Sequence, residues 1–321
     1  MAHLVEQMAY VGETPWHGLG NQLTEKQPLE VWSEQAGMNW QIEESPVHFI
    51  ARGDNHLGEL LAYPDSKVLY RSDTQEPLSV VGNRYKVVQP EEILEFYRDL
   101  TEISGFELET AGVLKGGRKL WALARTGQTG VLKGKDRTNA YVLLATACDG
   151  SMATTAQFTS VRVVCNNTLA VALQDQGAAA TSVKVRHSTA FDGEKVKKEL
   201  GISVSSWSRF MDQMKELSNR PVRIKESEDF FRKVFTDPNA RNPDNNQKAM
   251  ARALELFDGH GRGSDLASAR GTAYGLLNAV TEFVDHERRA RNTDYRLDSA
   301  WFGQGANLKQ KALDEAMALV V

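Results

Sequence analysis

Apolar and polar positions alternate most regularly between residues 139 and 173, where two long strand-like runs flank an Asp-Gly pair. Asp149-Gly150 predicts a two-residue type I′ turn, because both central positions of that turn need a positive φ that Asp and Gly tolerate. Extending this register along the ladder places Arg162 directly opposite Arg137. We therefore expect this β-hairpin to be the feature around which the fold is organised.

Alternation gives the two faces of the hairpin different surroundings. We expect one face to lie in the core, because its residues are mostly apolar; they are Tyr141, Leu143, Ala145, Ala147, Met152, Thr154, Ala156 and Phe158. The opposite face mixes Thr146 and Gln157 with Val142, so we expect partial exposure or contact with a polar ligand.

Short strands and a helix are predicted before this hairpin. Residues 39–88 alternate between β-rich runs and turn residues, which predicts a series of short strands. Pro90 and the two acids that follow it predict the start of a helix that ends near Ser104.

Residues 106–165 read as a four-stranded antiparallel meander. Lys115-Gly116-Gly117 joins its first two strands, and a loop from 126 to 138 joins the next pair. Asn166 and Asn167 end the last strand, and an asparagine there can cap a further helix by accepting a hydrogen bond from a free backbone amide.

Helical periodicity dominates the second half of the chain. Apolar residues recur every three or four positions from Val196 to Met214, which predicts a seam on one long helix that faces the core or a subunit interface. Shorter helices are predicted at residues 228–235 and 248–257. Ser264-Asp265 and Asn307 are predicted to cap the last two helices.

The fold class that these patterns predict is α+β. Residues 1–180 form an antiparallel, sheet-rich domain with packed helices, and residues 181–321 form a mainly helical region that packs on it or mediates oligomerisation. The boundary falls in the small, flexible run 176–180.

Composition is that of a soluble globular protein, with 41% apolar and 25% charged residues in 321. Apolar runs fall short of the roughly 18 residues that span a bilayer, and the N-terminal run lacks the order of a signal peptide. Cys148 and Cys165 lie at opposite ends of one predicted strand, too far apart to form a disulfide. We expect a cytoplasmic protein with no membrane partner, no metal site and no cofactor.

Charge is distributed unevenly along the chain. Residues 111–174 contain eight basic and two acidic residues, a net charge of +6, which leaves −10 for the remainder of a chain whose total is −4. Such asymmetry indicates an anionic partner, and the like-charged pair Arg137 and Arg162 is unfavourable unless a phosphate neutralises it. The candidate nucleic-acid-binding residues are Arg118, Lys119, Lys133, Lys135, Arg137 and Arg162. Alternatively, these cations only solubilise sheet edges.

A glycine-rich loop offers a second candidate phosphate site, formed by Gly261, Arg262, Gly263 and Ser264. Free amides near a helix start and an arginine can hold a phosphate. The loop lacks the Lys-Ser or Lys-Thr of a Walker loop, and a plain connecting loop is the alternative.

Three histidines are candidate general bases: His17, His260 and His286. A packed histidine is the alternative for each, and Glu282 can pair with His286 four residues away as a surface contact. The cluster of Arg288, Arg289 and Arg291 complements the dipole at the end of its helix, so it needs no ligand to explain it.

Five motifs carry a resemblance to a known family. They are Pro15-Trp16-His17-Gly18-Leu19-Gly20, Arg84-Tyr85-Lys86-Val87-Val88, Asp149-Gly150-Ser151, Val163-Val164-Cys165-Asn166-Asn167-Thr168 and Thr281-Glu282-Phe283-Val284-Asp285-His286. In this order the chain resembles the phage/plasmid-like protein family of unknown function. The resemblance implies a bacterial host cytoplasm and a mobile-element setting, and it brings no catalytic residue.

Our first hypothesis is a phage-type protein that binds single-stranded DNA, as a homo-oligomeric annealing or recombination factor. The second is an enzyme that acts on a nucleotide or phosphate ester, which requires the glycine-rich loop and a histidine to converge. The third is a counter-defence factor whose helical half docks a host protein. No catalytic residue is assigned, and an enzyme is the less favoured class.

Overall fold

The computed structural model describes residues 5–12, 20–53, 56–102, 105–170, 182–200, 204–236, 246–291 and 293–320. The chain divides into two compact units. The first contains Met1–Ala124, Val142–Gln157 and Ser182–Leu200, and the second contains Arg125–Tyr141, Phe158–Thr181 and Gly201–Val321. The predicted boundary at residue 180 lies outside the described residues.

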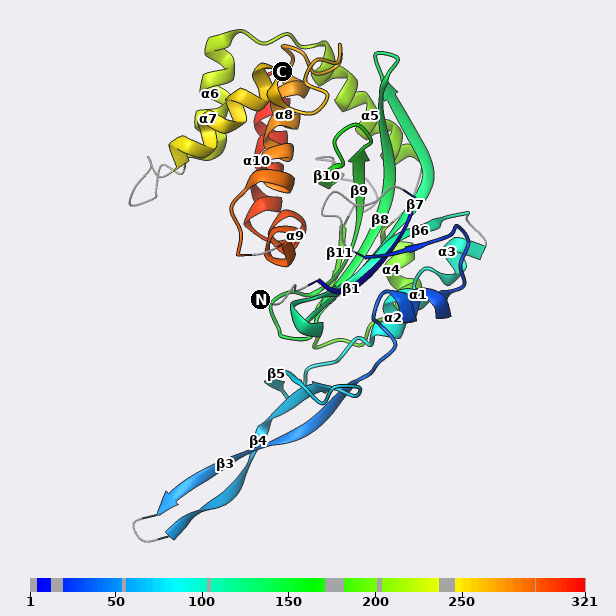
Figure 1. The fold of residues 1–321 in the computed structure, drawn as a ribbon, viewed down its shortest axis with the longest axis vertical. Helices are drawn as coiled ribbons and strands as arrows, with labels where there is room; N and C mark the ends of the chain where they lie inside the picture. Colours follow the sequence, from blue (N-terminus) through cyan, green and yellow to red (C-terminus); the bar gives the residue numbers. More distant parts are fainter. Residues whose placement is uncertain are drawn as a thin grey trace. The chain divides into compact units, whose positions relative to one another are not determined.

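Within the described residues, the larger sheet has eight strands. They are β1 (Val5–Val11), β2 (Asn21–Leu23), β6 (Glu107–Leu114), β7 (Lys119–Leu132), β8 (Asp136–Ala147), β9 (Thr154–Arg162), β10 (Asn167–Ala170) and β11 (Ser182–Val185). The order is β10-β9-β8-β7-β6-β1-β2, and β11 also pairs with β9 (Figure 1). The predicted meander of four consecutive strands is thus confirmed.

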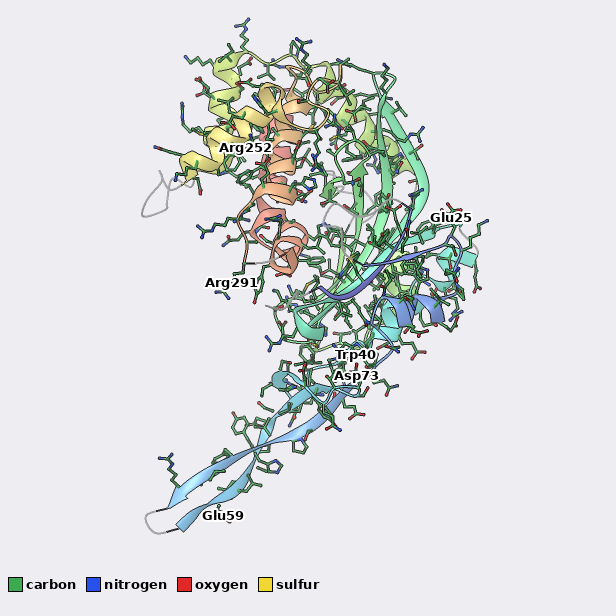
Figure 2. All side chains as sticks on the ribbon, viewed as in Figure 1. Glu25, Trp40, Glu59, Asp73, Arg252 and Arg291 are labelled. Atoms are coloured by element: carbon green, nitrogen blue, oxygen red, sulfur yellow. The ribbon has the colours of Figure 1, made fainter. Side chains whose placement is uncertain are left out.

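A second sheet contains β3 (Ile42–Gly53), β4 (His56–Arg71) and β5 (Pro77–Gly82), all antiparallel. Strands β3 and β4 form a long ribbon, and β5 pairs with its base (Figure 1). Every described residue from Glu43 to Asp65 is at least partly exposed, including Phe49, Ile50 and Leu60. Figure 2 shows Glu59 near the far end of the ribbon.

Short helices belong to the first unit. They are α1 (Leu29–Gln35), α2 (Pro90–Glu95), α3 (Arg98–Glu102) and α4 (Gly193–Leu200). Between α2 and α3, the buried Tyr97 places its hydroxyl 2.7 Å from the carbonyl oxygen of Ala122 and accepts a hydrogen bond from the amide of Leu144. This side chain therefore ties α2 and α3 to strands β7 and β8 of the same unit. A single helix was predicted from Pro90 to near Ser104, and the structure divides it into these two.

Longer helices belong to the second unit. They are α5 (Val204–Asn219), α6 (Ile224–Phe235), α7 (Gln247–Glu255), α8 (Ala273–Glu282), α9 (Thr293–Phe302) and α10 (Gln304–Met317). Single π-helical turns follow α7 at Leu256–His260 and α8 at Phe283–Glu287. On α5, Met211 packs against Gly130 of β7 and the ring of Trp207 lies 6.3 Å from that of Phe158.

The apolar seam predicted on one long helix is divided between two helices. Val196 and Leu200 lie on α4 in the first unit, and Trp207, Met211 and Met214 lie on α5 in the second. All five side chains are buried. These described members of the seam belong to the core, so they offer no docking surface for a host protein.

The register of the β8–β9 hairpin differs by one residue from the prediction. The amide of Val163 donates to the carbonyl of Arg137, and the hydroxyls of Thr146 and Thr154 lie 2.7 Å apart. The predicted pairing of Arg137 with Arg162 was therefore wrong, because a one-residue offset sends the two side chains to opposite faces. Arg137 is exposed and Arg162 is buried.

The connection between β8 and β9 explains the offset, since it runs over six residues, 148–153, rather than two. The carbonyl of Ala147 accepts from the Tyr85 hydroxyl, and that of Cys148 accepts from the Ser79 hydroxyl. The Cys148 carbonyl and the Ser151 amide would bond each other across a two-residue turn, but the Ser151 amide instead donates to the Asp149 side chain at 2.9 Å. The prediction that the face with Val142, Thr146 and Gln157 is partly exposed was wrong on β8, because residues 140–148 are all buried, whereas Gln157 on β9 is partly exposed.

Three predicted features of local structure were wrong. The loop expected at 126–138 is mostly strand, and its turn is only Lys133–Lys135, with Lys133 and Gly134 at positive φ. The helix expected after Asn167 begins instead as β10. Ser264-Asp265 and Asn307 do not cap, because Thr272 caps α8 and Asn307 lies inside α10.

The α+β class is confirmed, with strands concentrated in the N-terminal half and helices in the C-terminal half. No helix in the described part of the chain is long and apolar enough to cross a membrane.

Candidate anion-binding site

Two predicted cations of the first unit differ in exposure. Arg118 is exposed at the end of the β6–β7 turn, and Lys119 is buried at the start of β7. In the second unit Lys133, Lys135 and Arg137 are exposed around the β7–β8 turn, and the ammonium of Lys133 donates to the carbonyl of Ser218 at 2.6 Å. Each unit therefore has exposed residues among the cations that were predicted to bind nucleic acid.

Arg162 has a structural role. Its guanidinium donates to both carboxylate oxygens of Asp136, at 2.8 and 2.6 Å, and the two side chains are only 4% and 1% exposed. The Ser268 hydroxyl also donates to Asp136, and Gly263 accepts from Arg162 at 3.0 Å. Burial is the largest single effect on Arg162 and opposes its charge, but the hydrogen bond to Asp136 and the electrostatic effects of Asp136, Tyr274 and Cys165 together keep its pKa above the ordinary value. This buried cation does not face solvent, where a phosphate would lie.

Asp136 is the acid nearest in sequence to the exposed cations of the β7–β8 turn. Because Arg162 already pairs with it, Asp136 does not offset the surface charge of Lys135 and Arg137. The turn thus presents positive charge to solvent.

The glycine-rich loop does hold an anion, but the anion is the side chain of Glu282. Both oxygens of this carboxylate accept from the amide of Arg262, at 3.1 and 2.9 Å. The amides of Gly261 and Ser264 donate to the carbonyls of Leu256 and Gly261. These amides are therefore not available to a phosphate. Burial raises the pKa of Glu282, and the bond from the Arg262 amide partly opposes that rise.

The motifs at 163–168 and 281–286 meet in space. Asp285 accepts from the Thr168 amide at 2.7 Å and from the Lys309 ammonium at 2.8 Å. The side-chain amide of Asn167 donates to the Thr281 hydroxyl at 3.1 Å. All five residues belong to the second unit, where these hydrogen bonds hold β10 against α8 and α10. This polar cluster has a structural role, since buried charges are retained where they are paired and hydrogen-bonded.

The histidines do not form a catalytic set in the described structure. The Nε2 of His286 donates to the carbonyl of Cys165 at 2.8 Å, and Glu282 is buried, so a pair between Glu282 and His286 would not be the surface contact that was predicted. Burial lowers the pKa of His286. His260 is exposed beside the carbonyl of Glu255, and His17 lies outside the described residues.

Both cysteine thiols are buried, and burial raises the pKa of Cys148 and of Cys165 to about 12. Neither is a thiolate at neutral pH, so neither is an activated nucleophile. Among the described residues, no group of histidine, cysteine and carboxylate side chains is arranged to hold a metal ion.

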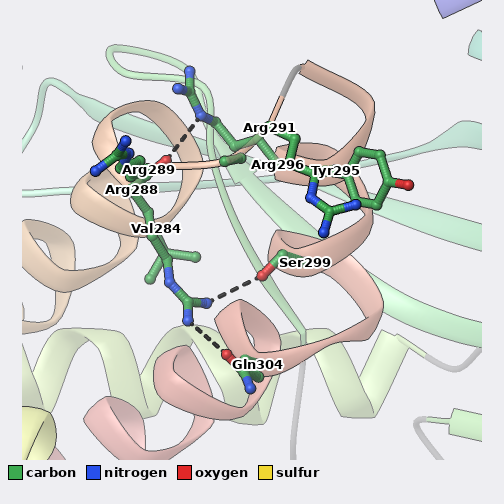
Figure 3. A pocket seen from close by; sticks show the side chains of 9 residues that line it. Val284, Arg288, Arg289, Arg291, Tyr295, Arg296, Ser299 and Gln304 are labelled. Carbon is green, nitrogen blue, oxygen red and sulfur yellow. Dashed lines mark hydrogen bonds between the residues drawn. The ribbon is translucent and has the colours of Figure 1, made fainter. Parts of the chain in front are cut away.

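An arginine-lined pocket of about 930 Å³ lies in the second unit, where the end of the α8 segment meets α9 and the start of α10 (Figure 3). We call it the arginine pocket. Its lining residues are Val284, Arg288, Arg289, Ala290, Arg291, Tyr295, Arg296, Ser299 and Gln304. No described lining residue is acidic, and four carry a permanent positive charge.

Neutral groups fix two of these arginines. The guanidinium of Arg288 donates to the hydroxyl of Ser299 at 3.1 Å and to the side-chain carbonyl of Gln304 at 2.9 Å (Figure 3). The Nε of Arg296 donates to the main-chain carbonyl of Arg288 at 3.2 Å. Burial lowers the pKa of Arg288. The charge on Arg288 is thus partly desolvated and held by neutral acceptors.

The other two arginines lie at the surface. Arg289 and Arg291 are exposed, and the guanidinium carbon of Arg291 lies 5.6 Å from the centre of the Tyr295 ring. Figure 2 shows Arg291 at the surface of the helical part of its unit. The pocket therefore combines fixed and exposed arginines with a 39% exposed aromatic ring.

Sequence reasoning did not identify this pocket. It explained Arg288, Arg289 and Arg291 by the helix dipole, and nothing in their spacing shows that α9 brings Arg296 and Tyr295 to the same place. The run of three arginines in four residues was the available signal.

The fold and pocket define an α+β protein with a positively charged, ligand-sized hollow. Residues 77–301 match the family described as a domain of unknown function, DUF932, and the chain belongs to that family. No curated protein and no solved structure matches the chain.

Proposed function

We propose that this protein binds single-stranded nucleic acid and that the arginine pocket holds phosphates of the strand. The observation that carries the proposal is that four arginines line one hollow whose described lining contains no carboxylate. Arginine suits phosphate because its planar fork donates two parallel hydrogen bonds. Neutralising phosphates releases condensed counterions, which drives binding.

The pocket also offers a surface for a base. Tyr295 is 39% exposed and lines the hollow, and base stacking on an aromatic ring contributes about 1–3 kcal/mol. Stacking tolerates any base, so this arrangement favours an unpaired strand over a duplex, whose bases already stack on one another.

Exposed cations elsewhere supply further phosphate contacts in the proposal. Lys135 and Arg137 are exposed at the β7–β8 turn, and Arg118 is exposed in the first unit. Arg162 and Lys119 are buried, so we leave both out of the proposed surface.

The resemblance to phage and plasmid proteins supports a finer version of the proposal. We propose a mobile-element protein that acts in the cytoplasm of a bacterial host as a homo-oligomeric annealing or recombination factor. Mass photometry with and without single-stranded DNA tests this version. Growth from monomer to ring or filament on adding DNA agrees with it, and a protein that stays monomeric on saturating DNA contradicts it.

Fluorescence anisotropy with a labelled, unstructured single-stranded oligonucleotide tests the binding function. The pocket variant is Arg289→Glu/Arg291→Glu, and the matched control is Lys248→Glu/Arg270→Glu, which reverses two exposed cations of the same unit outside the pocket. Each phosphate contact contributes about 0.7 to the slope of log affinity against log salt for a single strand. Loss of both contacts should reduce the slope by about 1.4.

The affinity of the pocket variant should fall at least tenfold at low salt, while the control stays close to wild type. Equal losses in both variants would show that only overall charge matters. No binding by the wild-type protein at low salt would refute the function.

A further inference from the structure

Beyond its contact with β5, the described part of the β3–β4 ribbon is two-stranded and exposes apolar side chains on both faces (Figure 1). Strand β5 pairs with β4 at residues 66–70. Farther out, Phe49 lies opposite Leu61 on one face, and Ile50 lies opposite Leu60 on the other. An isolated two-stranded hairpin is marginally stable at best in water, so a partner along this part would stabilise the ribbon.

The exposed apolar area of the ribbon is large for a monomer. Five of its large apolar side chains are 38–67% exposed; they are Phe49, Ile50, Leu60, Leu61 and Tyr63. At about 150–250 Å² for a fully exposed aromatic side chain, and less for leucine and isoleucine, they expose roughly 400 Å² per chain. Apolar patches of a few hundred Å² are the largest on a typical monomer and often mark interaction sites. Exposed polar neighbours such as His48 and Glu59 extend the area toward the roughly 800 Å² that each partner buries in a stable interface.

The outer edge of β3 is open. The described sheet has the order β3-β4-β5, so no described strand pairs with β3 on its other side. An edge of unpaired backbone amides and carbonyls is a template for a further strand. In a lipid surface these backbone groups would have no hydrogen-bond partners, so the open edge favours a protein strand over a membrane.

We infer that β3 pairs with β3 of a second copy of this chain, antiparallel and centred on His48, so that two ribbons form one four-stranded sheet. The contact is two-fold symmetric, and both copies use the same surface. The inference goes beyond the proposed function, because this pairing involves no nucleic acid.

The sequence of β3 is self-complementary about this centre. In the inferred register Glu44 lies opposite the partner subunit's Arg52, and Val47 lies opposite the partner subunit's Phe49. Opposite charges, and an aromatic residue facing a β-branched one, stabilise a ladder when they lie directly across it. Each match occurs twice in the symmetric pair, so the strand suits a second copy of itself.

Other two-fold registers lose these matches. The two-fold axis must pass through a residue of β3, because residues opposite each other must point to the same face of the sheet. An axis at Val47 places Arg52 opposite Ile42, and an axis at Phe49 places it opposite Pro46. The register centred on His48 is therefore the one that the charges of β3 favour.

Two features of β3 act on this pairing without preventing it. Glu44 already accepts from the Lys67 ammonium of its own ribbon at 2.6 Å, but its side chain is 47% exposed and accessible to a second cation. Pro46 has no amide hydrogen, so it removes at most one ladder bond from each strand. Neither feature affects the central pairs of Val47 with Phe49.

Sedimentation velocity without nucleic acid tests the association. We expect the wild-type protein to be a monomer at nanomolar concentration and a dimer at tens of micromolar. Arg52→Glu places two carboxylates opposite each other at both ends of the ladder, so it should weaken the dimer about tenfold. Lys198→Glu is the matched control, because it reverses an exposed cation on α4, outside the ribbon.

Disulfide cross-linking tests the register. Opposite residues of an antiparallel pair have Cα atoms about 4.5–5.5 Å apart, within the range that a disulfide spans. His48→Cys should therefore link two chains under mild oxidation, and a reductant should separate them. Ser45→Cys is the control, because its two copies would lie about 20 Å apart in this register. The native Cys148 and Cys165 are buried and do not compete.

A mixture of two variants makes the register test sharper. Residue 45 lies opposite residue 51 of the second copy in the inferred register. Ser45→Cys and Ala51→Cys proteins should therefore cross-link to each other when mixed, and neither should cross-link alone.

The outcomes separate the inference from its alternatives. A dimer that forms at tens of micromolar, weakens with Arg52→Glu and cross-links at position 48 supports it. A monomer at every concentration overturns it and leaves the edge of β3 to a strand of a different protein. A dimer that cross-links equally at positions 45 and 48, or that Arg52→Glu does not weaken, also overturns it, because the copies then meet elsewhere. None of these measurements uses nucleic acid, so the binding function is tested separately.

Discussion

The substitution Arg162→Ala tests the buried ion pair between Arg162 and Asp136, which accompanies the register of the β8–β9 hairpin. The Arg162 side chain is 4% exposed and pairs with Asp136 at 2.6 Å, and its guanidinium carbon lies 5.3 Å from the centre of the Tyr274 ring. Truncation leaves the Asp136 carboxylate buried, with the Ser268 hydroxyl as a remaining donor.

Removing one partner of a buried pair typically destabilises a protein by 3–5 kcal/mol, because the other charge stays desolvated. That loss is a large fraction of the 5–15 kcal/mol by which a domain is usually stable. The milder substitution Ser268→Ala removes only one donor to Asp136, so we expect a cost of about 1–3 kcal/mol. Arg137→Ala is the control, since this exposed side chain lies on the other face of the hairpin and should change stability little.

Urea unfolding followed by circular dichroism measures these differences from the transition midpoints. The expected order of destabilisation is Arg162→Ala first, Ser268→Ala second and Arg137→Ala last. Equal effects of Arg162→Ala and Arg137→Ala would refute the reasoning, because the predicted register, which pairs the two arginines directly opposite each other, gives them the same surroundings.

Three further predictions concern other parts of the chain. Because burial lowers the pKa of His286 below 6.5, its contribution to stability is complete above pH 6.5 and is lost as the pH falls; between pH 7.5 and 5.5, wild type should therefore lose more unfolding free energy than His286→Gln. Lys309→Met should cost about 3–5 kcal/mol in urea, and the double variant Asp285→Leu/Lys309→Met should cost less, because no unpaired charge stays buried; a larger cost for the double variant contradicts the assignment. Phe49→Ser/Leu61→Ser should leave the thermal midpoint within about 2 °C, since both side chains are exposed on the β3–β4 ribbon, and a large drop would show that the ribbon is packed.

Local sequence patterns predicted the elements better than their pairing. Pro90 and its acids marked α2, and the Lys115–Gly117 turn joined β6 to β7, because turn and cap chemistry acts within a few residues. At the β8–β9 connection the Ser79 hydroxyl, more than 60 residues away, donates to the Cys148 carbonyl that a two-residue turn needs. No local rule contains that information.

The roles of the candidate site residues were also hard to predict, because they depend on contacts between residues far apart in the sequence. Arg162 looked available because Asp136 was counted only as a neighbouring charge in the sequence, whereas a one-residue offset makes it a buried partner. Glu282 fills the glycine-rich loop from 20 residues away. The arginine pocket needed α9 to bring Arg296 beside Arg288, which only the fold supplies.

Salt-dependent binding of single-stranded DNA tests the central claim most directly. Anisotropy titrations of wild type, Arg289→Glu/Arg291→Glu and Lys248→Glu/Arg270→Glu between about 50 and 200 mM salt give three slopes of log affinity against log salt. The account predicts a slope shallower by about 1.4 and at least tenfold weaker binding for the pocket variant alone. Identical slopes for all three proteins, or no binding by wild type, would contradict it.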